Sequence, residues 1–229
     1  MGLGEKDVSI GSRHPSERMR RGLLSVVMLT ACSGGTVIGT TTAIDTTNHR
    51  VNQCDIRLTC ADTGAYVVGD TGPAGGIVFY VDDVDAYKGW KYLEAAPNTW
   101  NGTSGDPTAM WGCTGISIST GTAIGTGATN MAAILDAYAD LGIAARLAYE
   151  LTVGTKSDWF QPSIDELHLM YTKMYTNKFR IGGFEVSSYW SSSESYAYFA
   201  RRHDFYYGDQ SAYDKGYTAY VRPVRAFGS

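Results

Sequence analysis

Charged residues and metal-binding patterns are both scarce in this 229-residue chain. Asp, Glu, Lys and Arg make up 18% of the residues and 27 residues are glycine, which disfavours a helical bundle and favours a loop-rich α+β domain. The four cysteines form no Cys-x-x-Cys pair and no His pair accompanies them, as a zinc site would need. The acidic turn Asp82–Asp85 lacks the glycine and distant glutamate of a calcium-binding EF-hand loop. The sequence therefore predicts no metal site and no cofactor.

An excess of positive charge is also missing. The net charge is −4, and residues 1–31 hold five Lys/Arg and three Asp/Glu, so the remaining residues hold 14 and 20 and carry −6. Proteins that bind DNA or RNA depend on Lys and Arg side chains that neutralise phosphates. We therefore expect no nucleic acid partner.

The N-terminal residues have the pattern of an export signal. Arg18, Arg20 and Arg21 precede the apolar run Leu23–Leu29, which is too short to cross a bilayer. Leu29-Thr30-Ala31-Cys32 resembles a bacterial lipobox, in which the cysteine is acylated and becomes the new N-terminus. The pattern predicts a lipoprotein signal peptide over 1–31, lipidation of Cys32 and an exported bacterial lipoprotein at the outer membrane or cell surface. An ordinary cleaved signal is the alternative, and both Sec and twin-arginine export stay open.

We expect a flexible tether over 32–60 and a ligand-binding domain over 61–229. The first part of the tether is rich in Gly and Thr without apolar periodicity, although an irregular first strand is an alternative. Cys54 and Cys60 have the spacing of a small disulfide in an exported chain, which would leave Cys113 free, but spacing alone does not decide this pairing.

The domain begins with short strands and glycine-dense turns. The pattern predicts strands at Ala65–Val68, Ile77–Val81 and Trp90–Pro97. A phosphate-binding loop at the glycines between the first two is disfavoured, because a strand rather than a helix follows them. Residues 98–126 follow as a long irregular surface loop.

Two main helices come next. Apolar residues spaced i, i+3, i+4 and i+7 predict the first helix, with Thr129 or Asn130 as its cap: Met131, Ile134, Leu135, Tyr138. The same pattern recurs after Gly142: Ala144, Leu147, Ala148, Leu151. Ser163 and Glu166 have capping-box spacing at the start of the second helix. We expect its His168 to be a surface or partly buried histidine rather than a catalytic base.

Short antiparallel strands fill the C-terminal part, where residues 188–227 combine Tyr, Asp, Ser and Gly as antibody loops do. Alternation predicts that Val221, Pro223 and Arg225 face one way and Arg222, Val224 and Ala226 the other. We expect Arg222 and Arg225 to hold the last strand through hydrogen bonds.

Seven segments carry a resemblance to a known family: Gly69–Tyr80, Leu93–Pro97, Gly125–Asn130, Ala144–Ala148, Ser157–Ser163 with Glu166-Leu167, Tyr189–Glu194 and Val221–Phe227. In this order they resemble the C-terminal domain of bacterial collagen-like adhesins, over Tyr66 to Phe227. The resemblance implies a C-type-lectin-type fold with two main helices, short and mostly antiparallel strands, and long ordered loops. It also implies kinship with the variable proteins of diversity-generating retroelements, in which template adenines are randomised.

The retroelement hypothesis predicts a hypervariable segment at 195–219. Randomised asparagine codons reach Tyr, Asp, Ser, Gly, Ala, Thr, Arg, His and Phe, but not Lys, Glu, Gln, Met or Trp. The segment fits this set apart from Gln210 and Lys215, which match places where the family keeps those residues. The alternative is an invariant, Tyr-rich surface strand. The predicted ligand-binding residues are Ser195, Tyr196, Tyr198, Phe199, Arg201, Asp204, Tyr206, Tyr207, Asp209, Ser211, Tyr213, Asp214, Tyr217 and Thr218.

These expectations together describe a surface receptor or adhesin that binds a protein or glycan on another cell or surface, without catalysis. One alternative is an invariant adhesin for sulfated glycans, which would need a basic patch of Arg180, Arg201 and Arg202. Another is a relative of the formylglycine-generating oxidases, but the reactive cysteine pair of that chemistry is missing from the matched region. A Ser-His-Asp site with His203 and Asp204 is disfavoured, because neighbours on a strand point to opposite faces.

Overall fold

The computed structural model describes residues 24–25, 43–44, 65–176 and 180–228. The chain divides into two units, Met1–Leu58 and Thr59–Ser229. In the first unit, β1 (Leu24–Ser25) pairs antiparallel with β2 (Ala43–Ile44). The rest of the predicted signal peptide and tether, with Cys32, Cys54 and Cys60, lies outside the described residues.

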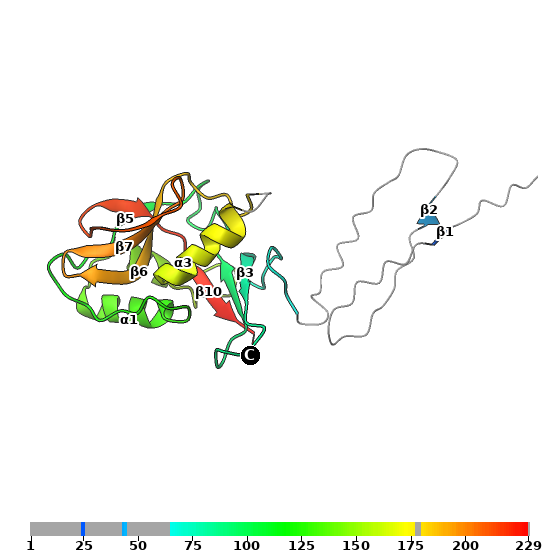
Figure 1. Ribbon diagram of the computed structural model, residues 1–229, viewed down its shortest axis with the longest axis horizontal. Coiled ribbons are helices and arrows are strands. Elements are labelled where there is room, and N and C mark those ends of the chain that lie inside the picture. The colour runs from blue at the N-terminus through cyan, green and yellow to red at the C-terminus, as the bar shows by residue number, and fades with distance from the viewer. Residues whose placement is uncertain (1–23, 26–42, 45–64, 177–179, 229) are drawn as a thin grey trace, which may run out of the picture. The chain divides into compact units, whose positions relative to one another are not determined.

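The second unit contains strands and short helices in a mixed order (Figure 1). Its elements are β3 (Ile77–Val81), β4 (Tyr92–Ala95), β5 (Thr108–Met110), α1 (Gly127–Ala137), α2 (Ala144–Tyr149), α3 (Ile164–Met170), the π-helix η2 (Tyr171–Tyr175), β6 (Ser188–Tyr196), β7 (Phe199–Asp204), β8 (Gln210–Asp214), β9 (Thr218–Tyr220) and β10 (Val224–Phe227). None of the helices in the described part of the chain is long and apolar enough to cross a membrane.

The strands of this unit form two sheets. One has the order β10-β4-β3 and is antiparallel throughout, so the last strand of the chain pairs with β4. The other has the order β5-β9-β6-β7-β8, with β6 and β9 parallel and the remaining pairs antiparallel. Helices α1 and α3 both pack on β6 (Figure 1). The predicted α+β class with mostly antiparallel strands is confirmed.

Several element predictions were wrong. Ala65–Val68 is not a strand, because the Asp70 side chain accepts a hydrogen bond from the Val67 amide and Gly69 turns the chain with a φ of +101°. Strand β5 lies inside the predicted loop 98–126, where it pairs with the distant β9. There are three described α-helices, since the pattern after Gly142 forms the separate helix α2.

The capping box of α3 is confirmed, while the predicted cap of α1 was wrong. Ser163 accepts from the Glu166 amide, and Glu166 accepts in return from the Ser163 amide at 2.7 Å. The Glu166 carboxylate also accepts from the Gly125 amide, so it joins the loop before α1 to the start of α3. Helix α1 follows Thr126, whose side chain makes no capping bond, and Asn130 instead bonds both backbone groups of Gly121.

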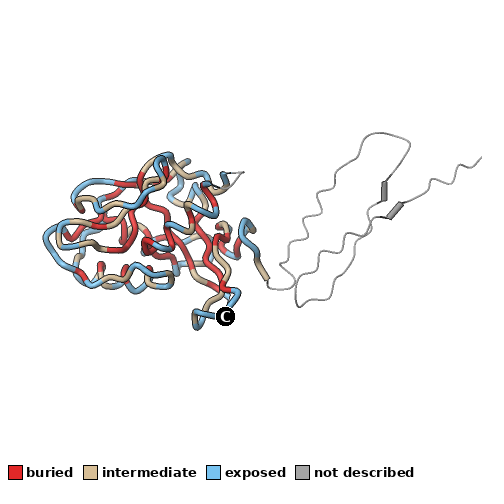
Figure 2. The backbone as a smooth tube through the Cα atoms, viewed as in Figure 1, coloured by how far each residue is buried: buried red, intermediate tan, exposed pale blue. Residues whose placement is uncertain are grey.

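The predicted alternation at the C-terminus does not appear as a burial pattern, because Val221, Arg222, Pro223, Val224 and Arg225 are all buried. The chain crosses here from β9 in the larger sheet to β10 in the smaller one, and Figure 2 shows buried backbone through the interior of this unit. Four apolar residues of the C-terminal part are buried in the core: Trp190, Val221, Val224, Phe227.

Hydrogen bonds of the two terminal arginines are confirmed, and both involve buried carboxylates. Arg222 Nε donates to Asp106 Oδ1 at 2.6 Å, and the other guanidinium nitrogens donate to backbone carbonyls of Ala96, Gly182 and Gly183. Arg225 pairs with Glu94 at 2.9 Å and with Asp158. Each contact connects the last strand to a segment far earlier in the chain.

We predict that Asp106→Asn destabilises the fold by about 3–5 kcal/mol, because it leaves the Arg222 charge buried without its counter-charge. Urea denaturation followed by tryptophan fluorescence measures the change in the free energy of unfolding. The matched control is Asp83→Asn, since Asp83 is exposed and should tolerate the change within about 0.5 kcal/mol. A loss below 1 kcal/mol in Asp106→Asn would contradict the role given to this pair.

Candidate functional site

The predicted ligand-binding residues lie on the hairpins of β6, β7 and β8 and the turn into β9. None of them is buried. Five tyrosines among them are exposed, with 57–79% of their surface accessible: Tyr196, Tyr198, Tyr206, Tyr207, Tyr217. Tyr196 ends β6 and the other four lie in turns, while buried residues of the same segment include Ala200, His203 and Phe205. The segment therefore combines an exposed aromatic surface with side chains that anchor it to the core.

Eight of the predicted residues form what we call the tip group, at the end of the β6–β7 hairpin: Ser195, Tyr196, Tyr198, Phe199, Tyr213, Asp214, Tyr217 and Thr218. The rings of Tyr196 and Phe199 lie 5.0 Å apart, and those of Tyr213 and Tyr217 lie 5.3 Å apart. Phe199 is opposite Asp214 in the β7–β8 register. The fold therefore places two aromatic pairs at one end of the sheet, on opposite faces, because Tyr213 is opposite Ala200 rather than Phe199.

Four others form what we call the turn group, at the opposite end of β7: Asp204, Tyr206, Tyr207 and Asp209. The Tyr206 and Tyr207 rings are 4.6 Å apart. The Asp204 carboxylate accepts from the amides of Tyr206 and Tyr207 and from the Ser188 hydroxyl. Asp204 thus closes the turn, and its oxygens are committed to the chain itself.

The structure does not bring the tip group and the turn group together. They lie at opposite ends of β7, a strand of six residues, which separates them by about 17 Å at 3.3 Å per residue. Arg201 and Ser211 lie between the groups on β7 and β8. A single small ligand cannot contact both groups, while a macromolecular surface can.

Lys215 anchors the tip group to the interior of the domain. Its ammonium is fully buried and donates to the carbonyls of Cys113 and Ile116 and to the Glu194 carboxylate. Its backbone amide donates to the Tyr198 carbonyl at 3.0 Å, which joins the β8–β9 turn to the β6–β7 hairpin. Sequence reasoning noted Lys215 as a kept residue but did not find this contact, because Glu194 is twenty-one positions away.

The three arginines of the predicted basic patch do not share one surface. Arg202 stacks on the Tyr213 ring at 3.7 Å and bonds Ser211. Its neighbour Arg201 points to the other face of β7, and its Nε is buried without a partner within the described residues. Arg180 lies over the Tyr175 ring, near the turn group.

The candidate nucleophiles are held in structural bonds. Ser191 donates to the Arg201 carbonyl and Ser193 to the Gly121 carbonyl. One ring nitrogen of His203 lies 3.0 Å from a ring nitrogen of His168. The other contacts the backbone carbonyl of Asp204, not its carboxylate. Burial raises the pKa of the Cys113 thiol to about 11, which disfavours a reactive thiolate. His168 is exposed, as predicted.

The glycine-dense turn after Gly69 surrounds a carboxylate of the chain itself. The Ala74 amide donates to Glu94, and a Cβ at Gly72 would lie 2.1 Å from Glu94 Oε2. A Cβ at Gly76 would lie 2.3 Å from the Ala95 carbonyl oxygen. The glycines therefore allow the turn to approach Glu94 closely, and this carboxylate accepts from the turn's own amide.

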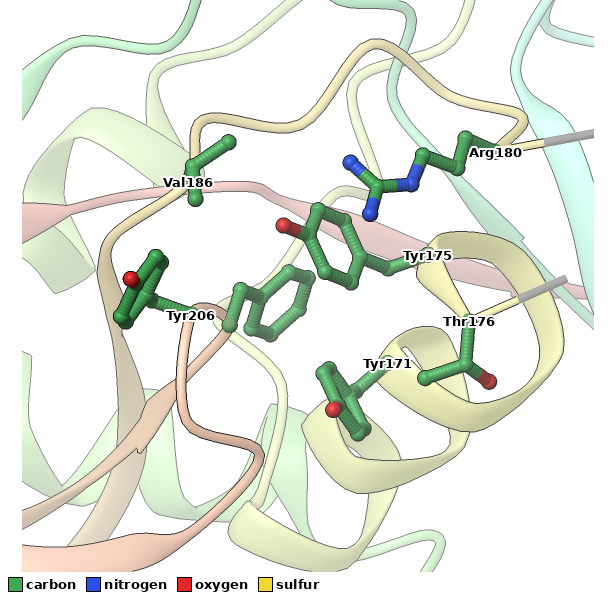
Figure 3. Close-up of a pocket in the computed structure, with 7 residues that line it drawn as sticks. Tyr171, Tyr175, Thr176, Arg180, Val186 and Tyr206 are labelled. Carbon is green, nitrogen blue, oxygen red and sulfur yellow. The ribbon is translucent and has the colours of Figure 1, made fainter.

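A cavity of about 420 Å³ lies beside the turn group, and sequence reasoning missed it (Figure 3). Its lining comes from η2, from the loop before β6 and from the end of β7: Tyr171, Tyr175, Thr176, Arg180, Val186, Phe205 and Tyr206. These residues are far apart in sequence, so no local pattern could have revealed the cavity. In the described part of the chain, no group of three or more His, Cys, Asp or Glu side chains could hold a metal ion.

Comparison with known proteins adds no assignment. No protein-family model matches the chain, and no curated protein matches it either.

We predict an acid-sensitive stability that depends on His203. Burial, with His168 nearby, lowers the pKa of His203 to about 4, against 6.5 for a free histidine, while Asp204 and Asp209 partly oppose the shift. Below pH 6.5 the His203 ring is protonated in the unfolded chain but stays neutral in the folded chain. The free energy of unfolding therefore falls from pH 6.5 to about 4, by up to about 3 kcal/mol.

Urea denaturation at pH 7, 5.5 and 4 measures this loss. In His203→Phe the contribution of this residue to the pH dependence should vanish, while His168→Phe, at an exposed position, should retain most of it. An equal slope in the parent chain and in His203→Phe would refute the assignment.

Proposed function

We propose that the chain is an exported, lipid-anchored surface protein that binds a macromolecular ligand through its Tyr-rich C-terminal hairpins, without catalysis. The observation that carries the proposal is the aromatic tip group, in which exposed tyrosines lie at the ends of strands and in turns that buried residues such as Lys215 fix. Tyrosines on a rigid support give large contact area at low entropic cost, which is how paratopes bind. The separation of the two groups favours a protein or glycan surface over a small molecule.

We further propose a C-type-lectin-type fold and diversification of 195–219 by a retroelement. The distribution of burial supports this proposal, because the predicted ligand-binding positions are exposed or half-buried. Lys215, which the codon logic leaves unchanged, is the buried anchor of the tip group. Gln210, the other residue of the segment outside the reachable set, is exposed, so this support rests on Lys215 and on the exposure of the predicted ligand-binding positions.

The alternatives have less support. A sulfated-glycan adhesin needs a joint basic patch, whereas Arg201 and Arg202 point to opposite faces and Arg202 is engaged with Tyr213. A formylglycine-type oxidase needs a reactive cysteine pair, whereas the described part of the chain offers Cys113, a buried thiol with a raised pKa.

Sequencing the genomic neighbourhood tests the diversification. We expect a reverse transcriptase gene and a near-copy of the segment that encodes 195–219, differing from it at template adenines. Clones from separate cultures should then differ at the tip-group codons and agree at Lys215. A neighbourhood without such a copy would contradict the retroelement and leave an invariant surface.

The tip tyrosines should be replaceable without loss of the fold. The triple change Tyr196→Ser, Tyr198→Ser and Tyr217→Ser should alter the free energy of unfolding by no more than about 1.5 kcal/mol, because all three side chains are more than half exposed. In the same segment, Lys215→Met should lower the free energy of unfolding by about 3–5 kcal/mol, since it leaves the Glu194 carboxylate without its counter-charge. Urea denaturation of both variants measures the contrast, and similar losses in the two would count against a replaceable surface.

A further inference from the structure

The cavity beside the turn group has an aromatic lining and one cation. We propose that it is a second, separate ligand site that takes a small aromatic carboxylate. Its volume of about 420 Å³ is within the range of about 300–1,000 Å³ found for small-molecule sites. Five of its seven lining residues lie outside 195–219, so the inference does not rest on the proposed function.

Aromatic rings form most of the wall. The Tyr171 and Tyr175 rings stack at 5.6 Å, and Phe205 lies 5.3 Å and 5.2 Å from them. Figure 3 shows Tyr206 on the opposite side of the cavity from η2. Both tyrosines of the stack belong to η2, and single π-helical turns of this kind are frequent at functional sites. A flat ring would find stacking or edge-to-face partners in this wall.

Arg180 gives the cavity its charge. Its guanidinium lies over the Tyr175 ring at 5.2 Å and points toward the cavity in Figure 3. No carboxylate pairs with it among the residues that the structure describes, and the nearby Asp204 is engaged with Ser188 and two backbone amides. This guanidinium is therefore available to a ligand, and its planar donors match a carboxylate in two-point hydrogen bonds.

The combination selects the chemical class. An aromatic cage alone would suit a cation, but the charge of Arg180 opposes one. Arg180 is exposed, so a neutral ring would gain nothing from its guanidinium, and a small inorganic anion would make no use of the rings. A ring that carries a carboxylate satisfies both parts of the lining.

Isothermal titration of the full chain with 4-hydroxyphenylacetate tests the proposal, with 4-hydroxyphenylacetamide as the neutral match and acetate as the anion without a ring. We expect the acid to bind at least tenfold more tightly than either. Arg180→Gln should weaken binding of the acid at least tenfold. The matched charge control is Lys88→Gln, since Lys88 is exposed and outside the lining, and it should leave the affinity unchanged.

Tyr206→Ser keeps the test valid should Arg180→Gln impair folding. Tyr206 is 64% exposed, so its replacement should preserve the thermal unfolding midpoint and still weaken binding several-fold. Equal affinity for acid and amide would overturn the proposal. So would unchanged binding in Arg180→Gln, or no detectable binding at millimolar concentration.

Discussion

The packing of the domain depends on the hydrogen bonds of one buried carboxylate, that of Asp106. It lies in the interior and accepts from Arg222, from the Trp100 indole and from the Tyr189 hydroxyl. Burial raises the pKa of Tyr189, so this hydroxyl stays protonated and donates. The three donors come from the long loop, from β6 and from the crossing between the sheets. The positions of these three segments are closely constrained, because a buried charge left without its partner costs several kcal/mol.

Ion pairs of the same kind occur in both sheets of the domain. Glu94 of β4 pairs with Arg225 of β10, and Glu194 of β6 pairs with Lys215 after β8. In both pairs, and in Asp106–Arg222, the carboxylate comes earlier in the chain than its cation. These buried pairs therefore fix the C-terminal segment against earlier parts of the chain, with a more specific alignment than apolar packing alone would give.

The features that the sequence predicts are those with local causes. Ser163 and Glu166 are three residues apart, so their capping box could be predicted, and the α+β class follows from composition and short apolar runs. Strand β5 could not be predicted, because its three residues are a strand only through their pairing with β9. The burial of Val221–Arg225 depends on the position of two sheets. The cavity and the separation of the tip and turn groups arise from contacts between distant segments, which periodicity does not record.

Strands β7 and β8 keep an unbroken register from Phe199–Asp214 to His203–Gln210, and Lys215 follows at once with its side chain locked in the interior. One inserted residue would turn every following side chain to the wrong face or pull the lysine from its carboxylate. Antibody repertoires gain much of their range from loops of different lengths. Within its paired strands this scaffold disfavours insertions, so a repertoire built on those strands would vary side-chain chemistry on a surface of constant outline.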